Sequence, residues 1–334
     1  MYEDFFGFRE APFDLTPNPR HLVITETHRE ALSNLHYAIA GRKGITLLVG
    51  EAGVGKTTVI RAAVQKQSER THCVHLTNPA LTRSEFVELL AIQFGLSNRA
   101  RASKAVFLQE LEQHLRDRRA EQERTVLIVD EAQRLSKELL EEIRLLANLE
   151  TDEEKLLTLV IAGQPEVALR LNRRSLEQLK QRVTLRCTLR ALTENETVAY
   201  IAGRIQSAGG SPSNVFTREA VGLIAEYAHG LPRTINVIAD NALLGGFAAG
   251  KRPVTRDLVR QVCLDFDINA IVDPSERQAG FSRGLRPPHA RVPSAASPAD
   301  VVMAQPAATD QRSATCAERP APAFSVPWRR PPVI

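Results

Sequence analysis

The sequence predicts an α/β fold, in which a parallel sheet flanked by helices is followed by a smaller all-helical domain. Three observations support it. A glycine-rich loop lies between an apolar run, residues 45–49, and a helix-forming run, residues 59–67. Strand-sized apolar runs then alternate with stretches of helical period, which is typical of a parallel sheet. Beyond Leu192 only helical periodicity remains.

The glycine-rich loop fits the P-loop pattern G-x-x-x-x-G-K-[ST]. Its glycines allow backbone conformations that a Cβ would forbid, so successive N–H groups can converge on phosphate oxygens at a helix N-terminus. We expect Lys56 to reach the β- and γ-phosphates and Thr57 to bind Mg²⁺. The predicted nucleotide-contacting residues of the loop are Gly50, Glu51, Ala52, Gly53, Val54, Gly55, Lys56, Thr57 and Thr58.

The remaining elements follow in order along the chain. Strands are predicted at residues 45–49, 72–76, 125–129, 157–162 and 183–189. Helices are predicted at 27–40, 82–94, 104–119 and 136–148, as short helices up to Lys180, and then at 194–208, 217–228, 232–245 and 255–266. Residues 97–103 are expected to form a polar, basic link.

The predicted domains are an N-terminal arm (1–26), a P-loop α/β core (27–190), an all-helical domain (191–270) and a disordered tail (271–334). The arm is rich in aromatics, and its prolines exclude a helix around them, so we expect an extended segment packed on the globular body. After Asp273 the chain holds 11 of its 19 prolines, with much alanine and serine, a composition that is implausible for a packed core.

The positive net charge belongs to the tail. Residues 274–334 hold eight arginines, no lysine and four acids, which leaves 35 basic and 35 acidic residues in the first 273. The high isoelectric point is therefore weak support for nucleic-acid binding.

The chain is expected to be cytoplasmic. The four cysteines, Cys73, Cys187, Cys263 and Cys316, show no metal-ligand spacing and suit reduced thiols. No apolar run approaches the roughly 18 residues that a transmembrane helix needs, and the acidic N-terminus does not resemble a signal peptide.

An acidic pair ends the third predicted strand. Hydrolysis of a phosphoanhydride needs one carboxylate for Mg²⁺ and another to activate water, so Asp130 is assigned to the metal and Glu131 to the general base. As a local pattern, an Asp-Glu pair is also common as a helix cap. The chain has no Asn-Lys-x-Asp motif for guanine, which favours ATP over GTP.

Three further polar residues are candidates for the site. Gln164 ends a strand, where it would contact attacking water or the γ-phosphate, or act as a turn residue before Pro165. Arg182 would be an arginine finger or ordinary surface charge. Arg233 is predicted in the first turn of a helix, an unfavourable end of the dipole for a cation unless an anion approaches.

The chain resembles the ExeA/GspA-type AAA+ ATPases, described as general secretion pathway protein A and its relatives. The resemblance covers about residues 1–268. The residues that carry it are the opening segment 2–20, His28-Arg-Glu-Ala-Leu32, the P-loop, Val129-Asp-Glu-Ala-Gln133, Gly163-Gln-Pro-Glu166, Gln181-Arg-Val183 and Gly230-Leu-Pro-Arg233.

The resemblance implies an AAA+ core with a helical lid. Gln164 would be sensor 1, Arg182 a finger acting in trans and Arg233 sensor 2. The family's longer members add a transmembrane helix and a peptidoglycan-binding domain, where this chain has only its proline- and alanine-rich tail.

The sequence is compatible with two functions. The first is an ATPase that couples ATP turnover and homo-oligomerisation, as a ring or filament, to a protein partner of a secretion or envelope-assembly system. The second is a DNA-dependent ATPase of the transposon-targeting type, in which Arg99, Arg101 and Lys104 would contact phosphates. For these three residues the alternative is a solvated link. A nucleotide-gated scaffold without turnover is disfavoured by Glu131.

Overall fold

The computed structural model describes residues 1–16, 25–77 and 80–268. Within these residues, five parallel strands form one sheet in the order β2-β3-β4-β1-β5. The strands are β1 Ile45–Gly50, β2 Thr71–Leu76, β3 Arg124–Val129, β4 Thr158–Gly163 and β5 Val183–Leu189. All five predicted strands are confirmed to within one residue at each end. The predicted disordered tail, 271–334, and Cys316 lie outside the described residues.

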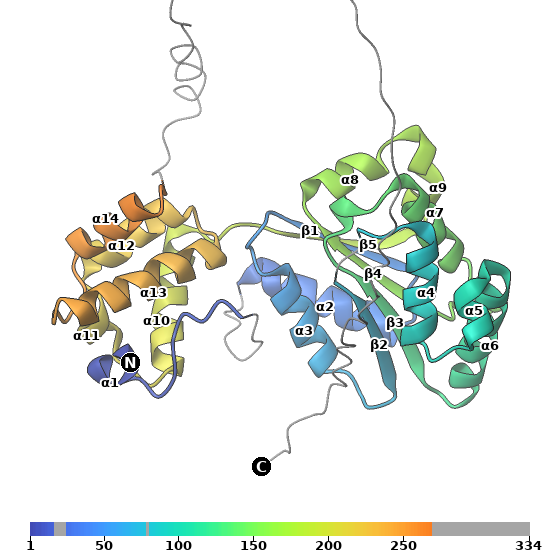
Figure 1. The fold of residues 1–334 in the computed structure, drawn as a ribbon, viewed down its shortest axis with the longest axis horizontal. Helices are drawn as coiled ribbons and strands as arrows, with labels where there is room; N and C mark the ends of the chain where they lie inside the picture. Colours follow the sequence, from blue (N-terminus) through green and yellow to red (C-terminus); the bar gives the residue numbers. More distant parts are fainter. Residues whose placement is uncertain (17–24, 78–79, 269–334) are drawn as a thin grey trace, which may run out of the picture. The chain divides into compact units, whose positions relative to one another are not determined.

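Helices cover both faces of the sheet (Figure 1). The order of these elements is α2 Glu26–Ala40, α3 Lys56–Gln65, α4 Arg83–Gln93, α5 Asn98–Ala102, α6 Lys104–Ala120, η2 Ala132–Arg134, α7 Lys137–Leu146, α8 Pro165–Leu171, η3 Arg174–Leu176 and α9 Glu177–Lys180. We call the segment from α2 to β5 the α/β part. Side chains alternate along each strand, so Val126 and Ile128 of β3 pack with α2 and α3. Leu127 and Val129 pack with the helices of the other face.

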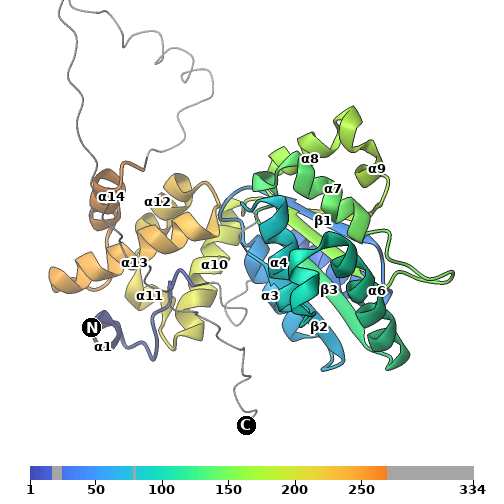
Figure 2. The same cartoon turned by 45° about the vertical axis from the view of Figure 1, so that its right-hand side comes forward.

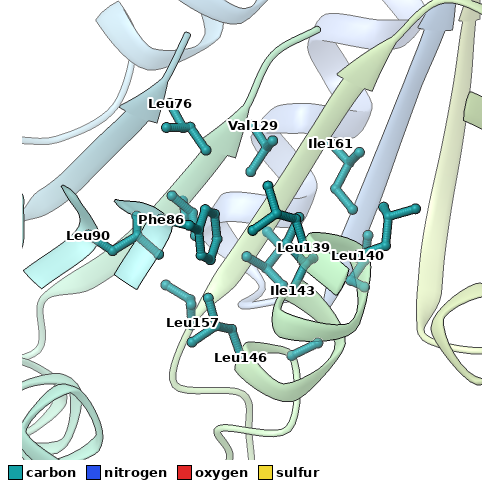
Figure 3. Close-up of a cluster of buried hydrophobic side chains, with 14 of the residues drawn as sticks. Leu76, Phe86, Leu90, Val129, Leu139, Leu140, Ile143, Leu146, Leu157 and Ile161 are labelled. Carbon is teal, nitrogen blue, oxygen red and sulfur yellow. The ribbon is translucent and has the colours of Figure 1, made fainter. Parts of the chain in front are cut away.

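The larger of the two sheet cores lies under α4 and α7 (Figure 3). Phe86 and Leu90 of α4 and Leu139, Leu140, Ile143 and Leu146 of α7 meet Leu76, Val129, Leu157 and Ile161 of the sheet side. Leu139, Leu140 and Ile143 are all 0% exposed. This packing fixes the strands whose carboxyl ends carry the predicted site.

One sequence expectation is wrong. Residues 97–103 are not a link, because α5 runs from Asn98 to Ala102. Ser97 caps this helix, its Oγ accepting the N–H of Ala100, and Ala100 is completely buried. Serine is a strong N-cap residue, so Ser97 is a local signal for this helix start within a stretch rich in basic residues.

The second part of the chain is all-helical, as predicted (Figures 1 and 2). Its helices are α10 Glu194–Ser207, α11 Pro212–Val215, α12 Arg218–Ala228, α13 Pro232–Ala248 and α14 Arg256–Asp265. We call this segment, residues 192–268, the helical part. In the described ranges, no helix is long and apolar enough to cross a membrane.

The N-terminal arm packs on the helical part and contains a short helix, α1 Tyr2–Phe6, that the sequence did not predict. Tyr2, Phe6, Phe8 and Phe13 of the arm belong to the same buried cluster as α10, α12, α13 and α14. The Tyr2 hydroxyl donates a hydrogen bond to Asp240 of α13. Within residues 1–16 the arm packs on the globular body as expected, but α1 shows that it is not extended throughout.

Candidate nucleotide-binding site

The P-loop joins the carboxyl end of β1 to the start of α3. Gly53 and Gly55 have φ of +84° and +100°, in the left-handed region that favours glycine. A Cβ on Gly50 would lie 2.8 Å from Cγ2 of Val54 and 2.9 Å from the carbonyl oxygen of Leu189. The loop therefore requires glycine at these three positions, for two different physical reasons.

The P-loop lysine is buried beneath its own loop. Nζ of Lys56 donates hydrogen bonds to the carbonyl oxygens of Gly50 and Glu51, at 2.9 and 3.0 Å. Burial lowers the pKa of Lys56, and the carboxylates of Glu131 and Asp130 oppose this shift. The acidic pair at the end of β3 therefore lies close enough to act on the lysine charge.

Thr57 and Asp130 meet directly, although they lie far apart in the sequence. Oγ1 of Thr57 donates to Oδ2 of Asp130 at 2.7 Å, and Asp130 is 4% exposed. A hydroxyl and a carboxylate are the oxygen ligands that Mg²⁺ prefers. No cluster of three or more His, Cys, Asp or Glu side chains that could hold a metal occurs in the described ranges. A magnesium ion in such sites commonly takes one or two protein ligands and phosphate oxygens, so the residues present fit it.

Glu131 follows Asp130 in a left-handed backbone conformation, with φ 54° and ψ 35°. This conformation is unusual for a residue with a side chain. Its N–H donates to Oδ1 of Asp130 at 2.9 Å. Its carboxylate accepts a hydrogen bond from Nε2 of Gln133 at 2.6 Å. Gln133 is not among the site residues predicted from the sequence.

The other three predicted residues lie at different places. Gln164 is the N-cap of α8, directly after β4. The N–H of Arg233 donates to the carbonyl oxygen of Gly53 at 3.3 Å, so the start of α13 lies against the P-loop. Arg182 lies before β5, and its carbonyl oxygen accepts the N–H of Ile45 at 3.3 Å. That places Arg182 at the amino ends of β1 and β5, at the edge of the sheet opposite the P-loop.

A cavity of about 340 Å³ opens beside the P-loop. Its wall includes three groups that the sequence did not assign: Asp14, Leu15 and Thr16 of the arm, His28 of α2, and Leu192, Tyr200, Arg204, Pro232 and Asn236 of the helical part. These residues come from both ends of the described chain, and no local motif joins them.

His28 is buried at 2% exposure and contacts the P-loop backbone. Its Nε2 lies 3.3 Å from the carbonyl oxygen of Val54, and its Nδ1 lies 2.6 Å from Oγ1 of Thr25. A carbonyl oxygen only accepts, so Nε2 carries the proton and Nδ1 accepts from Thr25. Burial lowers the pKa of His28, which favours this neutral form.

The three cations of the DNA alternative lie on α5 and at the start of α6. Nζ of Lys104 lies 2.8 Å from Oε2 of Glu142, whose side chain is 5% exposed. Arg83 also pairs with Glu142. Arg99 is close enough to Glu110 to lower the pKa of that carboxyl, after the hydrogen bonds from Ser97. Part of the positive charge of this surface is therefore neutralised within the chain.

A family model described as an AAA domain matches residues 39–171. The chain is 38% identical over 285 residues to General secretion pathway protein A of Aeromonas hydrophila. That match covers 85% of this chain and 52% of the relative. The chain therefore spans about half the length of the curated relative it matches.

Solved structures with the same fold include two Aeropyrum pernix proteins. ORC2 in its ADPNP-ADP complexes has a TM-score of 0.61 at 19% identity, covering 81% of this chain and 75% of that chain. ORC1 in complex with DNA has a TM-score of 0.60 at 20% identity, covering 78% and 70%. The RuvB Holliday junction branch migration motor of Thermotoga maritima has a TM-score of 0.52 at 20% identity, covering 77% and 74%.

At these identities the structural likenesses show the fold alone, a P-loop sheet flanked by helices. The relative at higher sequence identity and the AAA domain model show more than the fold. The chain belongs to the AAA-domain proteins and is related over 85% of its length to general secretion pathway protein A.

Proposed function

We propose that this protein binds ATP with Mg²⁺ and hydrolyses it at the carboxyl edge of the sheet. The observation that carries the proposal is the 2.7 Å hydrogen bond between Thr57 and Asp130, beside Lys56 and Glu131. Four groups from two distant segments meet where a polyphosphate would lie on the P-loop. This convergence is what phosphoryl transfer to water requires.

Each group has a separate role in the proposed reaction. The P-loop N–H groups and Lys56 bind phosphate oxygens, and Thr57 and Asp130 hold Mg²⁺. The ion supplies positive charge to the β- and γ-phosphate oxygens when it is bound. Glu131 accepts the proton of the attacking water. Gln164 orients that water or the γ-phosphate from the end of β4.

Two variants test this assignment. Lys56→Ala should abolish ATP binding, because it removes the phosphate-binding charge. Glu131→Gln should retain ATP binding and stop turnover, because it spares Asp130 and the metal site. Equal ATP affinity in the wild type and Lys56→Ala, measured by calorimetry, would contradict the P-loop assignment.

We propose further that ATP is hydrolysed between subunits of an oligomer, with Arg182 as the finger. Arg182 lies at the opposite edge of the sheet from its own P-loop, and β1 between them is six residues long, which corresponds to about 20 Å. Its buried Nε has no hydrogen-bond partner among the described residues. Because about 20 Å of strand separates Arg182 from its own P-loop, Arg182 is remote from the nucleotide bound there. This favours action on the nucleotide of a neighbouring subunit.

Mixing variants tests the finger. Arg182→Ala should keep nucleotide affinity and lose turnover by roughly 10³-fold or more. Mixing it with Lys56→Ala should restore part of the activity, because some interfaces then pair an intact P-loop with an intact finger. An inactive mixture, with co-assembly confirmed by light scattering, would count against a finger in trans.

Arg233, which belongs to the helical part, is proposed to contact a phosphate of the bound nucleotide. Its backbone bond to Gly53 places the first turn of α13 against the P-loop, where an anion offsets the unfavourable position of a cation at a helix N-terminus. A phosphate would supply that anion. Arg233→Ala should therefore weaken ATP binding less than Lys56→Ala, which removes the charge closest to the phosphates.

The partner is proposed to be a protein of a secretion or envelope-assembly system, on the strength of the relative's name. The internal neutralisation of Lys104 by Glu142 argues against the DNA-dependent alternative. ATP turnover should therefore respond little to duplex DNA at physiological salt in protein that ends near Asp273. Strong stimulation that is lost when Arg99, Arg101 and Lys104 are replaced by alanine would favour the DNA-dependent function.

A further inference from the structure

The side-chain amide of Gln133 joins the ends of two neighbouring strands. Nε2 donates to Oε2 of Glu131, which follows β3, at 2.6 Å. Oε1 accepts the backbone N–H of Gln164, which follows β4, at 3.0 Å. A carboxylate only accepts and a backbone N–H only donates, so the two partners fix the orientation of the amide.

Gln133 is closely packed against Gly163 and hydrogen-bonded to Arg170. A Cβ on Gly163, the last residue of β4, would lie 2.9 Å from Oε1 of Gln133 and 3.3 Å from its backbone nitrogen. Arg170 of α8 donates to the carbonyl oxygens of Gln133 and Leu135, at 2.8 and 2.7 Å. Residues that follow β4 thus hold both parts of Gln133: Arg170 binds its backbone carbonyl, and the N–H of Gln164 binds its side chain.

Strand register makes the bridge possible. Val129 of β3 is paired with Ile161 of β4, so the segments after these residues leave the sheet at the same carboxyl edge. The side chain that bridges Glu131 and Gln164 belongs to Gln133 in η2, the turn after Glu131. The N–H of Arg134 closes that turn on the carbonyl oxygen of Glu131 at 2.9 Å.

We propose that Gln133 is a positioning residue for the general base. Its side chain orients the carboxylate of Glu131 and links it by hydrogen bonds to the backbone of Gln164. Gln164 is the residue proposed to contact the γ-phosphate or the attacking water. The inference rests on the proposed function, because it assigns Glu131 as the base. The left-handed backbone of Glu131 is unfavourable for a residue with a side chain, so its neighbours hold it in that conformation.

The first test separates catalysis from binding. Gln133→Asn shortens the side chain by one methylene, so it cannot reach both partners. Steady-state kinetics should show a loss in kcat of roughly 10- to 100-fold. The KM for ATP and the ATP affinity should stay unchanged. The matched control is Gln113→Asn on the exposed face of α6, which should behave as the wild type.

A second variant keeps the length of the side chain and removes its donor. In Gln133→Glu, a carboxylate replaces the amide, and a carboxylate cannot donate a hydrogen bond to Glu131. The kcat of Gln133→Glu should therefore fall at least as far as that of Gln133→Asn, with the KM for ATP unchanged. A wild-type kcat in Gln133→Glu would overturn the proposal.

Glu131→Gln separates the two levels of failure. If Glu131→Gln is inactive and Gln133→Asn has wild-type kcat, or a higher one, the positioning role alone is overturned. If Glu131→Gln hydrolyses ATP at the wild-type rate, the assigned base is wrong and the role of Gln133 is overturned with it. Adding Gln133→Asn to Glu131→Gln should reduce the residual turnover no further, because the amide acts through the carboxylate.

Discussion

The α/β part and the helical part of this protein build their hydrophobic cores in different ways. The two sheet cores draw their buried residues from one continuous stretch, Ala31 to Leu189. The core of the helical part combines residues 192–263 with four aromatic residues of the arm, Tyr2, Phe6, Phe8 and Phe13. The cores of the α/β part are built from one continuous segment of the chain. The core of the helical part also needs residues from the N-terminus of the chain.

The polar contacts differ in the same way. At the sheet edge, the hydrogen bonds of Gln133 join segments about thirty residues apart. In the helical part, Nε of Arg204 donates to the carbonyl oxygen of Pro12 at 2.5 Å, and Nη2 of Arg204 donates to the carbonyl oxygen of Asp14 at 3.2 Å. Tyr200 and Asn236 extend this buried network through a 2.9 Å hydrogen bond. The arm is thus a structural component of the helical part and also lines the nucleotide cavity.

The largest expected effect comes from removing an aromatic of the arm. Phe13 is 0% exposed and packs edge-on against Phe216. Phe13→Ala should destabilise the helical part by about 3–5 kcal/mol. Amide hydrogen exchange should then accelerate in α10, α12 and α13 and stay unchanged in β1, β3 and β4.

The matched control is Phe86→Ala in α4, which is 1% exposed and lies in the sheet core. It should accelerate exchange in the sheet and spare the helical part. If both variants accelerate exchange equally in both parts, the two cores unfold as one cooperative unit and the distinction drawn here is wrong.

A smaller effect is expected from the polar anchor of the arm. Arg204 is 6% exposed, and Arg204→Met keeps most of its apolar contacts while removing the donors to Pro12 and Asp14. Leaving buried carbonyls without their donors should cost about 1–3 kcal/mol. Urea unfolding of the helical part measures this loss.

The control for the anchor is Arg190→Met. Arg190 pairs with Glu196 at 2.9 Å, but its side chain is 45% exposed. An exposed pair of this kind contributes about 0–1 kcal/mol. If the two variants lose equal stability, the contribution of Arg204 is that of an ordinary surface pair, and the arm is held by its aromatic residues alone.

Much of the fold and part of the site could be predicted because the signals are local. The P-loop spacing, the Asp130–Glu131 pair and the apolar strands each occupy one short stretch of sequence. Arg233 could also be predicted as a candidate, since a cation at a helix N-terminus is unfavourable without an anion. In the structure its backbone N–H contacts the carbonyl oxygen of Gly53. In each case the physical reason lies within a few residues.

The missed features depend on tertiary placement. Gln133 reaches Gln164 only because β3 and β4 pair in this register, which the sequence of neither strand specifies. His28 contacts Val54 because α2 packs beside α3. The arm has no periodicity from which its place could be derived. The α5 helix is different, since its N-cap residue Ser97 is a local signal that the sequence does contain.

The smallest expected effect is a pH dependence confined to the α/β part. Burial lowers the pKa of His28, His72 and His75. Arg118 and His114 reinforce this shift at His72, whereas at His75 the carboxylate of Asp130 opposes it and Arg61 reinforces it. The described residues of the helical part contain one histidine, His229. Acidification should therefore act on the two parts unequally.

The sign of this effect follows from proton uptake. A histidine whose pKa is depressed in the folded state binds its proton more readily when unfolded, at a pKa near 6.5, so stability falls as the pH drops below that value. Between pH 6.5 and 5.5 the loss should stay under about 1 kcal/mol for each ring, because solvent reaches part of His72 and His75. Protection factors from hydrogen exchange should decrease in β1 and β2 before they decrease in α12 and α13. If protection is lost first in α12 and α13, the buried histidines of the α/β part do not determine how this protein loses stability in acid.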